Sequence, residues 1–405
     1  GMSYLTALIV SLPLGLTGMG FELVVLLGCV LMAWRWPRSR SWSLAIGATV
    51  LFAGSMLFIA LSLWMWYPPS SVDCDTPLAS EAVERLSPAA WVQGLSQPYS
   101  LLYIPEEAWL LASFKMAGNG HLDFWDEPTA NRVMGVDIHD TSTVVEVPFV
   151  GQNMPCYMVY EPRTREVFLS QTGVGADTLD ILSLADLPRI THKTSVDVAF
   201  KTHSVVAHPS LPRFGVLDQQ GWFFLLDGTG LEEVSRLFLG PGREKFVVPL
   251  GAWHAPGTSS VYLSVLLGPV VEVDMDIGYV RWSEDSFGGG TLTGSTRTSE
   301  LFQTDLFLDR VNVIDRQTLT VTRRLELDYT PRAVAVDESR DLLIVGDWFG
   351  GVARFYRMST LEPLPGHVPV GPYLRDLAYA PTEGLLFTGS KCGVYQVDVA
   401  KALGR

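Results

Sequence analysis

The feature that most constrains the fold is a recurring strand–turn–strand unit. An apolar strand ends in a turn that contains proline, and a second apolar strand follows. Five such prolines lie 57, 47, 47 and 125 residues apart, and the last gap accommodates three units of about 42 residues. They are Pro105, Pro162, Pro209, Pro256 and Pro381. Short strands at even spacing, punctuated by turn residues, predict a β-propeller.

A second marker has the same spacing. It is an aspartate that ends an apolar strand before a tight turn, where its carboxylate is expected to bond to the turn backbone. It occurs at Asp137, Asp227, Asp274, Asp315 and Asp398. Together the markers predict an all-β, seven-bladed propeller over residues 90–405, with four strands in each unit. The last unit supplies only three strands, so we expect the fourth from around Ala90–Leu95, which would close the ring and remove an exposed sheet edge.

Three segments of the sixth unit and its surroundings carry a resemblance to a known family. Residues 311–318 read VNVIDRQT, residues 330–337 read TPRAVAVD and residues 342–347 read LLIVGD. Over residues 305–390 the chain resembles the YVTN family of β-propeller repeats and is similar to WD40-like and NHL-like propellers. The resemblance implies a propeller. Because the family and its neighbours include surface proteins, scaffolds and lactonase enzymes, it implies no particular reaction.

Two long apolar stretches precede the repeat. Residues 4–34 contain a single charged residue, Glu22, and residues 42–67 contain none. Since about 20 apolar residues cross a bilayer, we predict a transmembrane helical hairpin within residues 1–67, with spans of about 5–33 and 43–66. No base precedes the first stretch, which favours an uncleaved anchor over a signal peptide. Residues 68–89 would form an extracytoplasmic linker.

The charges around these stretches predict their orientation. Arg35, Arg38 and Arg40 lie between the two spans, whereas Asp73 follows the second. Basic residues favour the cytoplasmic side, so the link is expected in the cytoplasm. We therefore predict a two-pass protein of the inner membrane, in contact with the lipid bilayer, whose propeller lies on the periplasmic side.

Glu22 is unusual because an ionisable side chain at membrane depth is costly. One interpretation is a protonated carboxyl group that bonds to a hydroxyl group of the second span. The other is that Glu22 contacts a helix of another subunit, which the small residues of both spans would allow to approach closely. On the second interpretation Glu22 is a partner-binding residue.

The propeller region is strongly acidic. Residues 73–405 contain 42 of the 43 acidic residues and 26 of the 29 basic residues, a net charge of −16. Such a surface repels a phosphate backbone, and no basic run offsets the repulsion, so we predict no nucleic-acid partner.

One loop is much longer than its counterparts. Residues 115–131 separate the second and third strands of the first unit, where residues 218–221 suffice in the third. Long loops in compact rings are often functional, and aromatic residues beside acidic ones are typical of docking surfaces. The alternative is that the aromatic residues cap the neighbouring unit. The partner-binding residues predicted here, with two from a loop expected on the same face, are His121, Phe124, Trp125, Asp126, Glu127, Asp347 and Trp348.

Catalytic and metal-binding motifs are missing from the sequence. It contains no HExxH, CxxC or GxSxG, and the run Gly288–Gly290 leads into no helix that could bind phosphate. We therefore predict no catalytic residue, metal or cofactor. The alternative function is a lactonase-like hydrolase, or a ligand-binding propeller, with a site in the central channel. The innermost strands would offer such a site His203, Arg332, Arg375 and Asp376.

Three cysteines, Cys74, Cys156 and Cys392, fall on the side predicted to be oxidising. A disulfide between Cys74 and Cys392 would join the linker to the last unit. The alternatives are three free thiols or a bond to another protein.

These features predict a membrane-anchored, extracytoplasmic propeller that binds proteins as a scaffold subunit of a larger membrane complex. Its contacts with other subunits would come from the transmembrane helices and the propeller loops. We expect a binding module rather than an enzyme.

Overall fold

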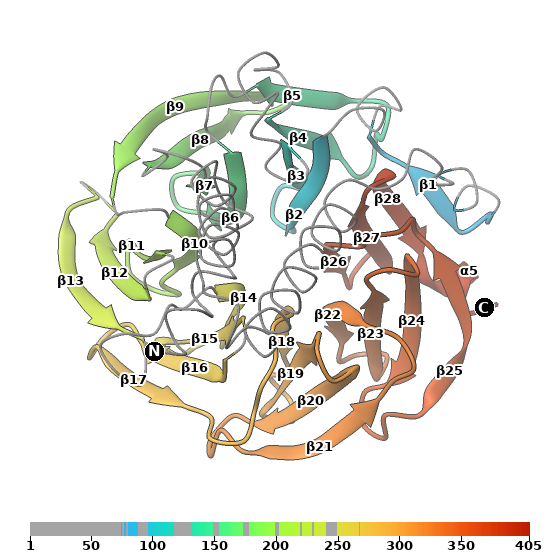
Figure 1. Cartoon of the computed structure of the whole chain (residues 1–405). Coiled ribbons are helices and arrows are strands. Elements are labelled where there is room, and N and C mark those ends of the chain that lie inside the picture. The colour runs from blue at the N-terminus through green and yellow to red at the C-terminus, as the bar shows by residue number, and fades with distance from the viewer. Residues whose placement is uncertain are drawn as a thin grey trace, which may run out of the picture. The chain divides into compact units, whose positions relative to one another are not determined.

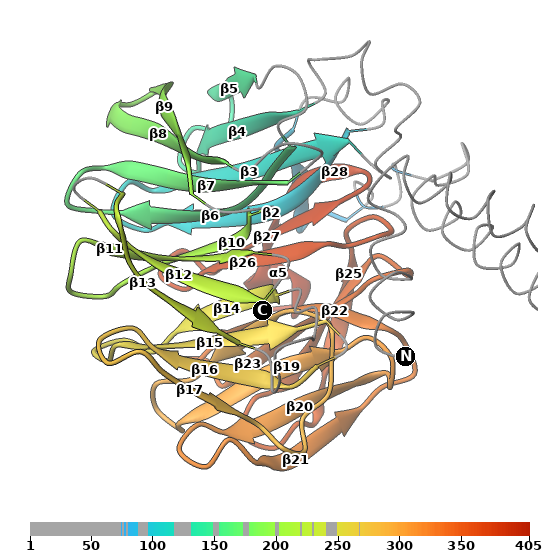
Figure 2. The same cartoon turned by 60° about the vertical axis from the view of Figure 1, so that its left-hand side comes forward.

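The computed structural model describes residues 74, 77, 80–87, 96–116, 131–148, 154–172, 178–198, 202–218, 221–228, 231–239, 249–266 and 268–405. These residues form seven four-stranded antiparallel sheets. The sheets follow one another around a common axis (Figure 1), and a turned view shows neighbouring sheets packed against each other (Figure 2). The predicted seven-bladed propeller is confirmed.

The predicted hairpin, with spans 5–33 and 43–66, lies outside the described residues. Within the described ranges no helix combines the length and the apolar character that a membrane crossing requires.

Blades 1 to 6 have their strands in chain order from the channel outward. Blade 1 consists of β2 (Ser96–Ile104), β3 (Trp109–Met116), β4 (Arg132–Asp137) and β5 (Val144–Pro148). Blade 2 consists of β6 (Met154–Glu161), β7 (Glu166–Thr172), β8 (Thr178–Asp186) and β9 (Arg189–Asp197). Blade 3 consists of β10 (Thr202–Ala207), β11 (Arg213–Asp218), β12 (Trp222–Asp227) and β13 (Glu233–Phe238). Blade 4 consists of β14 (Pro249–His254), β15 (Ser260–Val265), β16 (Val270–Asp274) and β17 (Tyr279–Trp282). Blade 5 consists of β18 (Leu292–Gly294), β19 (Glu300–Asp305), β20 (Arg310–Asp315) and β21 (Val321–Glu326). Blade 6 consists of β22 (Pro331–Asp337), β23 (Leu342–Asp347), β24 (Val352–Arg357) and β25 (Pro363–Pro369).

Blade 7 combines the two ends of the propeller. It contains β26 (Asp376–Ala380), β27 (Leu385–Ser390) and β28 (Gly393–Asp398), followed by the short helix α5 (Val399–Ala402). Its outermost strand is β1 (Val83–Arg85), which pairs antiparallel with β28. The expected closure by a strand from before the first unit is thus present.

The position expected for that closing strand was wrong. The strand is Val83–Arg85 rather than Ala90–Leu95, so it lies inside the segment predicted as linker. An outermost strand has one edge and much of its surface in solvent, and this one reads Val-Glu-Arg with no apolar alternation over its three residues. Hydrophobic pattern, the signal used for the other strands, is therefore weak here.

The aspartate marker has the role expected for it. In four of the five positions a side-chain oxygen accepts a backbone N–H of the segment that follows the third strand, which is a turn in three cases and the short helix α5 after Asp398. The pairs are Asp137 with His139 at 2.8 Å, Asp274 with Asp276 at 2.9 Å, Asp315 with Thr318 at 2.7 Å and Asp398 with Lys401 at 3.0 Å.

A disulfide also ties the two ends together. Cys74 is bonded to Cys392, which precedes β28, with the Cα atoms 5.2 Å apart and a sequence separation of 318. This is the pair named from the sequence as a possible disulfide, and it is present. Cys156 is buried and forms no disulfide with a described residue.

We predict that the Cys74→Ala variant has a lower free energy of unfolding than the wild type by about 2–5 kcal/mol, because a cross-link over a long loop restricts the unfolded chain. Denaturant titration measures the difference. As a control, a reducing agent should bring the wild type to the stability of the variant and leave the variant unchanged. Equal stability of both proteins without reductant would contradict the prediction.

Candidate functional site

β-Bulges recur at one end of the channel. Near the first residue of four innermost strands the register shifts, as in a β-bulge. The residue left over is His203 in β10, Leu250 in β14 and Arg332 in β22, and in β6 the shift covers Cys156 and Tyr157. A bulge re-aims the side chain that it leaves unpaired. Because every blade has the same topology, these side chains gather at the same end of the channel.

Hydroxyl groups of the preceding blade hold three of these residues in place. Each comes from a second strand and donates to the carbonyl oxygen of the bulge residue next door. The pairs are Ser113 Oγ with Cys156 O at 2.7 Å, Ser170 Oγ with His203 O at 2.8 Å and Thr304 Oγ1 with Arg332 O at 3.1 Å. The bulges are therefore fixed parts of the blade interfaces.

Aromatic rings line this end of the channel. The Tyr157 ring centroid lies 5.6 Å from that of Tyr99 and 5.4 Å from that of His203. The Tyr157 hydroxyl donates to Leu250 O at 2.5 Å. Four blades thus meet around one tyrosine, which leaves the ring little freedom.

Three buried cations lie beside these rings. Arg332, Arg375 and Lys391, which we call the cation cluster, are only 4%, 6% and 7% exposed. The Cζ atoms of Arg332 and Arg375 lie 5.8 Å and 5.9 Å from the centroid of Trp348, and Lys391 Nζ lies 4.2 Å from that of Tyr373. Cation–π contacts therefore compensate part of the cost of burying these charges.

The burial shows in the pKa values of this region. Burial lowers the pKa of Arg375 to about 10, and burial together with the charge of Arg375 lowers the pKa of Lys391 to about 7. Burial also raises the pKa of Asp376 to about 6, although its oxygens accept the N–H groups of Leu101 at 2.8 Å and Leu377 at 2.9 Å. The site is a low-dielectric environment in which charge is costly.

The glycine run Gly288–Gly290 helps to build the site. Arg332 Nη1 donates to Gly289 O at 3.0 Å. A Cβ atom at Gly290 would lie 1.8 Å from Thr304 Oγ1, so only glycine allows the run to lie this close to β19. Among the described residues, the glycine run therefore helps to hold the Arg332 side chain in place.

Two donors of the site are unsatisfied. Arg332 Nε and Trp348 Nε1 are buried, and neither has a hydrogen-bond partner among the described residues. Buried polar atoms are almost always paired, so each such orphan needs a physical explanation.

The channel next to this site holds a cavity of about 690 Å³, which all seven innermost strands line. Tyr157 and Asp376 line it and also border the cation cluster, while His208 and His254 line the part near the proline turns. Most of the remaining lining consists of aliphatic side chains of the strands. The cavity size is within the range of small-molecule sites.

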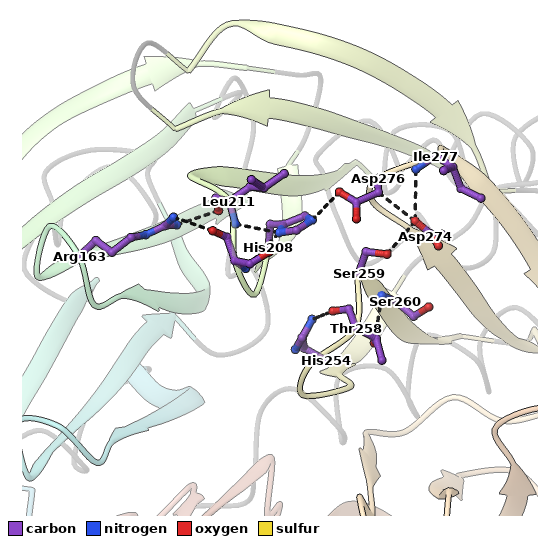
Figure 3. A network of polar contacts seen from close by, with 11 residues as sticks. Arg163, His208, Leu211, His254, Thr258, Ser259, Ser260, Asp274, Asp276 and Ile277 are labelled. Atoms are coloured by element: carbon purple, nitrogen blue, oxygen red, sulfur yellow. Dashed lines mark hydrogen bonds and ion pairs between the residues drawn. The ribbon is translucent and has the colours of Figure 1, made fainter.

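His208, which lines the cavity near the proline turns, has a structural role (Figure 3). His208 Nδ1 accepts the N–H groups of Ser210 at 3.2 Å and Leu211 at 3.0 Å, and its Nε2 lies 3.0 Å from Asp276 Oδ1. Two backbone donors make Nδ1 an acceptor, so Nε2 carries the proton and donates it to Asp276. Both nitrogens are occupied, and the contact joins blades 3 and 4.

His254, nearby, is also committed to the backbone. Its Nε2 lies 3.0 Å from Thr258 O (Figure 3). Burial lowers the pKa of His254. His254 therefore has a structural role within its own turn.

A cluster of Asp180, His192 and Ser195 in blade 2 was not expected from the sequence. His192 Nε2 lies 3.0 Å from Asp180 Oδ1 and 3.1 Å from Ser195 Oγ. A nucleophilic triad needs the carboxylate on one ring nitrogen and the hydroxyl on the other. Because both groups contact the same nitrogen, this cluster lacks that geometry. Among the described residues there is also no group of three or more His, Cys, Asp or Glu residues arranged to hold a metal ion.

Most of the predicted partner-binding residues lie outside the described part of the chain, namely Glu22, His121, Phe124, Trp125, Asp126 and Glu127. Trp348 belongs to the site, and its ring lies 5.8 Å and 5.9 Å from the Cζ atoms of Arg332 and Arg375. Asp347 is 6% exposed, and its Oδ1 accepts the Gly350 N–H at 2.9 Å, a contact within its own turn. The interaction of these residues with a partner remains a prediction.

The sequence indicated some of this site. His203, Arg332, Arg375 and Asp376 were expected on the innermost strands. His203, Arg332 and Asp376 lie on β10, β22 and β26, and Arg375 directly precedes β26; of the four, Asp376 lines the cavity. Lys391, Tyr99 and Tyr157 were missed. Tyr99 directly follows Pro98 in β2, and Arg332 directly follows Pro331 in β22. This shared position near the start of an innermost strand is the signal that could have identified this end of the channel.

Comparison with protein-family models finds no match, and comparison with curated proteins finds none either. The resemblance to YVTN repeats thus remains a prediction, while the propeller fold follows from the strands themselves.

We predict that Asp376 makes stability depend on pH. Its folded pKa of about 6 exceeds the ordinary value of 3.8, so between these values the folded state keeps a proton that the unfolded chain has lost. Its contribution therefore decreases as pH rises from about 4 to about 6. The difference in unfolding free energy between the wild type and Asp376→Asn should fall by on the order of 2–3 kcal/mol over this window. Denaturant titrations at several pH values measure it.

Asp337→Asn is the matched control. Burial opposes ionisation of Asp337, but hydrogen bonds from Ser339, Tyr379 and Arg340 hold its pKa at about 2. Its contribution is lost only as pH falls from about 4 toward 2, so the difference between wild type and Asp337→Asn should stay constant above about pH 5. A constant difference for Asp376→Asn as well would refute the assignment.

Proposed function

We propose that this chain is a membrane-anchored, extracytoplasmic binding subunit whose propeller engages a partner protein. The engaged surface is the loop face, by which we mean the end of the ring formed by residues 283–290, 305–310, 347–351 and 390–392. The anchor is the predicted hairpin of residues 1–67.

An apolar patch on the loop face carries the proposal. Phe287, Phe307 and Leu308 are 39%, 50% and 50% exposed, and the centroids of the two phenylalanine rings lie 6.3 Å apart. Single exposed apolar residues are common on soluble surfaces, whereas a contiguous group of large ones marks an interaction site. Aromatic residues are also enriched at the centre of protein interfaces.

The rim of the patch indicates the charge of the partner. Glu284, Asp285 and Asp309 are exposed beside it. With the net charge of −16 in residues 73–405, this favours a partner with apolar side chains surrounded by lysine or arginine. A protein subunit of the same membrane complex meets this description. We do not advance a hydrolase, because the described His, Asp and Ser groups have the structural contacts given above.

We predict that the double variant Phe307→Ser, Leu308→Ser loses its partner. The full chain, purified from native membranes in mild detergent, should carry a stoichiometric companion subunit, and the variant should carry much less of it because the apolar centre is removed. Quantitative mass spectrometry of both preparations measures the loss.

The double variant Ile277→Ser, Tyr279→Ser is the control. These residues are 77% and 55% exposed, but they belong to the turn and strand after β16, at the opposite end of the blade. It should retain the companion. A wild type that migrates alone, or equal loss in both variants, would count against the proposal.

We further predict the orientation of the propeller. In sealed spheroplasts, from which the outer membrane has been removed, added protease should remove an epitope placed after Arg405, since the propeller is proposed to lie outside the cytoplasm. Removal only after lysis would reverse the orientation. Extraction of the chain by alkaline carbonate would argue against the anchor.

A further inference from the structure

The disulfide determines where the chain is attached to the ring. Cys392 lies in the turn between β27 and β28, which belongs to the loop face, and Cys74 is bonded to it there. Arg85 Nη2 also donates to Cys74 O at 2.9 Å, which holds Cys74 at the same place. Among the described residues, the first attachment of the chain to the ring is thus on the loop face.

Without this bond the attachment would lie at the opposite end of blade 7. β1 runs antiparallel to β28, so its first residue, Val83, pairs with Val397. Next to it, Ala82 O accepts the N–H group of Asp398 at 2.9 Å. Asp398 ends the six-residue strand β28 at the end of the blade that carries the proline turns. Six residues of a strand are about 20 Å long, so the disulfide moves the attachment by about that distance.

The chain before the disulfide has a short reach. The apolar stretch predicted as the second span ends at Tyr67, seven residues before Cys74. Seven residues extend over at most about 25 Å. The proline turns lie at least one strand, about 20 Å, beyond the loop face. To bring them to the bilayer the chain would have to be fully extended, which is entropically costly. The loop face needs no such extension.

Given the anchor and the partner of the proposed function, on which this depends, we propose that the loop face is turned toward the bilayer and binds a juxtamembrane segment of the companion subunit. Apolar side chains of that segment pack on Phe287, Phe307 and Leu308. Lysine or arginine side chains of the segment meet the acidic rim of this patch. The companion's own membrane anchor keeps the segment within reach, which raises its effective concentration at the patch.

The charge of the rim favours a protein segment over lipid as the occupant. Glu284, Asp285 and Asp309 are exposed around the patch. Carboxylates repel anionic lipid head groups, whereas they attract the basic side chains of a protein. Aromatic side chains with an acidic rim therefore fit a basic, partly apolar peptide better than a bilayer surface.

Photo-cross-linking in native membranes tests this contact. A benzophenone amino acid replaces Phe307 in one variant and Tyr279 in the other, so each variant keeps an aromatic ring. These positions are 50% and 55% exposed and lie at opposite ends of the blades. We expect cross-linking from position 307 only, to a companion peptide that contains lysine or arginine and lies within about 20 residues of a membrane span. Mass spectrometry of the cross-linked peptide identifies it.

Cross-linking of position 307 to lipid alone would overturn the proposal and make the bilayer the occupant. Cross-linking to a part of the companion far from any span would overturn the contact at the membrane. Equal cross-linking from both positions, or none from position 307, would also refute it.

The role of the disulfide is tested by the length of the chain before it. About ten glycine and serine residues inserted between Ser71 and Val72 add up to about 35 Å of reach. Cross-linking from position 307 to the juxtamembrane peptide should then fall several-fold, because the loop face is no longer held near the bilayer.

The same insertion between Asp75 and Thr76 is the matched control. It lies after Cys74, so the disulfide bypasses it, and the cross-linking yield should equal that without an insertion. Circular dichroism and mass spectrometry without reductant verify the fold and the disulfide in each variant. Equal yields from the two insertions would refute the role of the disulfide.

Failure of this contact and failure of the proposed function give different results. Loss of the companion in Phe307→Ser, Leu308→Ser, combined with cross-linking of position 307 far from any span, would uphold the proposed function and overturn the contact at the membrane. A wild type without a companion would overturn both.

Discussion

Closure of the ring is the constraint on which the rest of this structure depends. A blade can bury both faces of its sheet only when it has a neighbour on each side, as the fully buried β23 illustrates. The joint between blades 7 and 1 is where this could fail, because blade 7 is assembled from the two ends of the propeller and only the short strand β1 links it to blade 1 along the chain. There Leu101 N donates to Asp376 at 2.8 Å and Thr141 donates to Glu84 at 2.9 Å, above a core that both blades share.

Closure also explains why the channel can hold charge. The innermost strands are tied to neighbouring blades by the hydroxyl contacts at Ser113, Ser170 and Thr304, so the bulges between them cannot relax. Arg332, the charged side chain at one of these bulges, is consequently kept in a medium from which water is largely excluded. This is costly to the fold, and the raised pKa of Asp376 is one measure of the cost.

The blades could be predicted because their signal is periodic. The proline turns and the aspartate turns each repeat, and each has a local physical reason, which the hydrogen bonds of Asp137 and Asp315 illustrate. The closing strand Val83–Arg85 could not be placed, since three residues with one apolar side chain have no pattern. For the site, the sequence supplied Arg332 and Arg375, but the presence of Lys391 beside Arg375 depends on the turn between β27 and β28. The Asp180–Ser195 contact depends on strand register, which periodicity alone does not give.

The bond between Cys74 and Cys392 has a mechanical consequence. Any pull on the chain from before Cys74 passes through a covalent link into the turn between β27 and β28, and so bypasses the three-residue strand β1. The load reaches strands inside blade 7 rather than the weak outer edge that would otherwise peel first. A domain suspended by its N-terminal side would in this way be held by its interior.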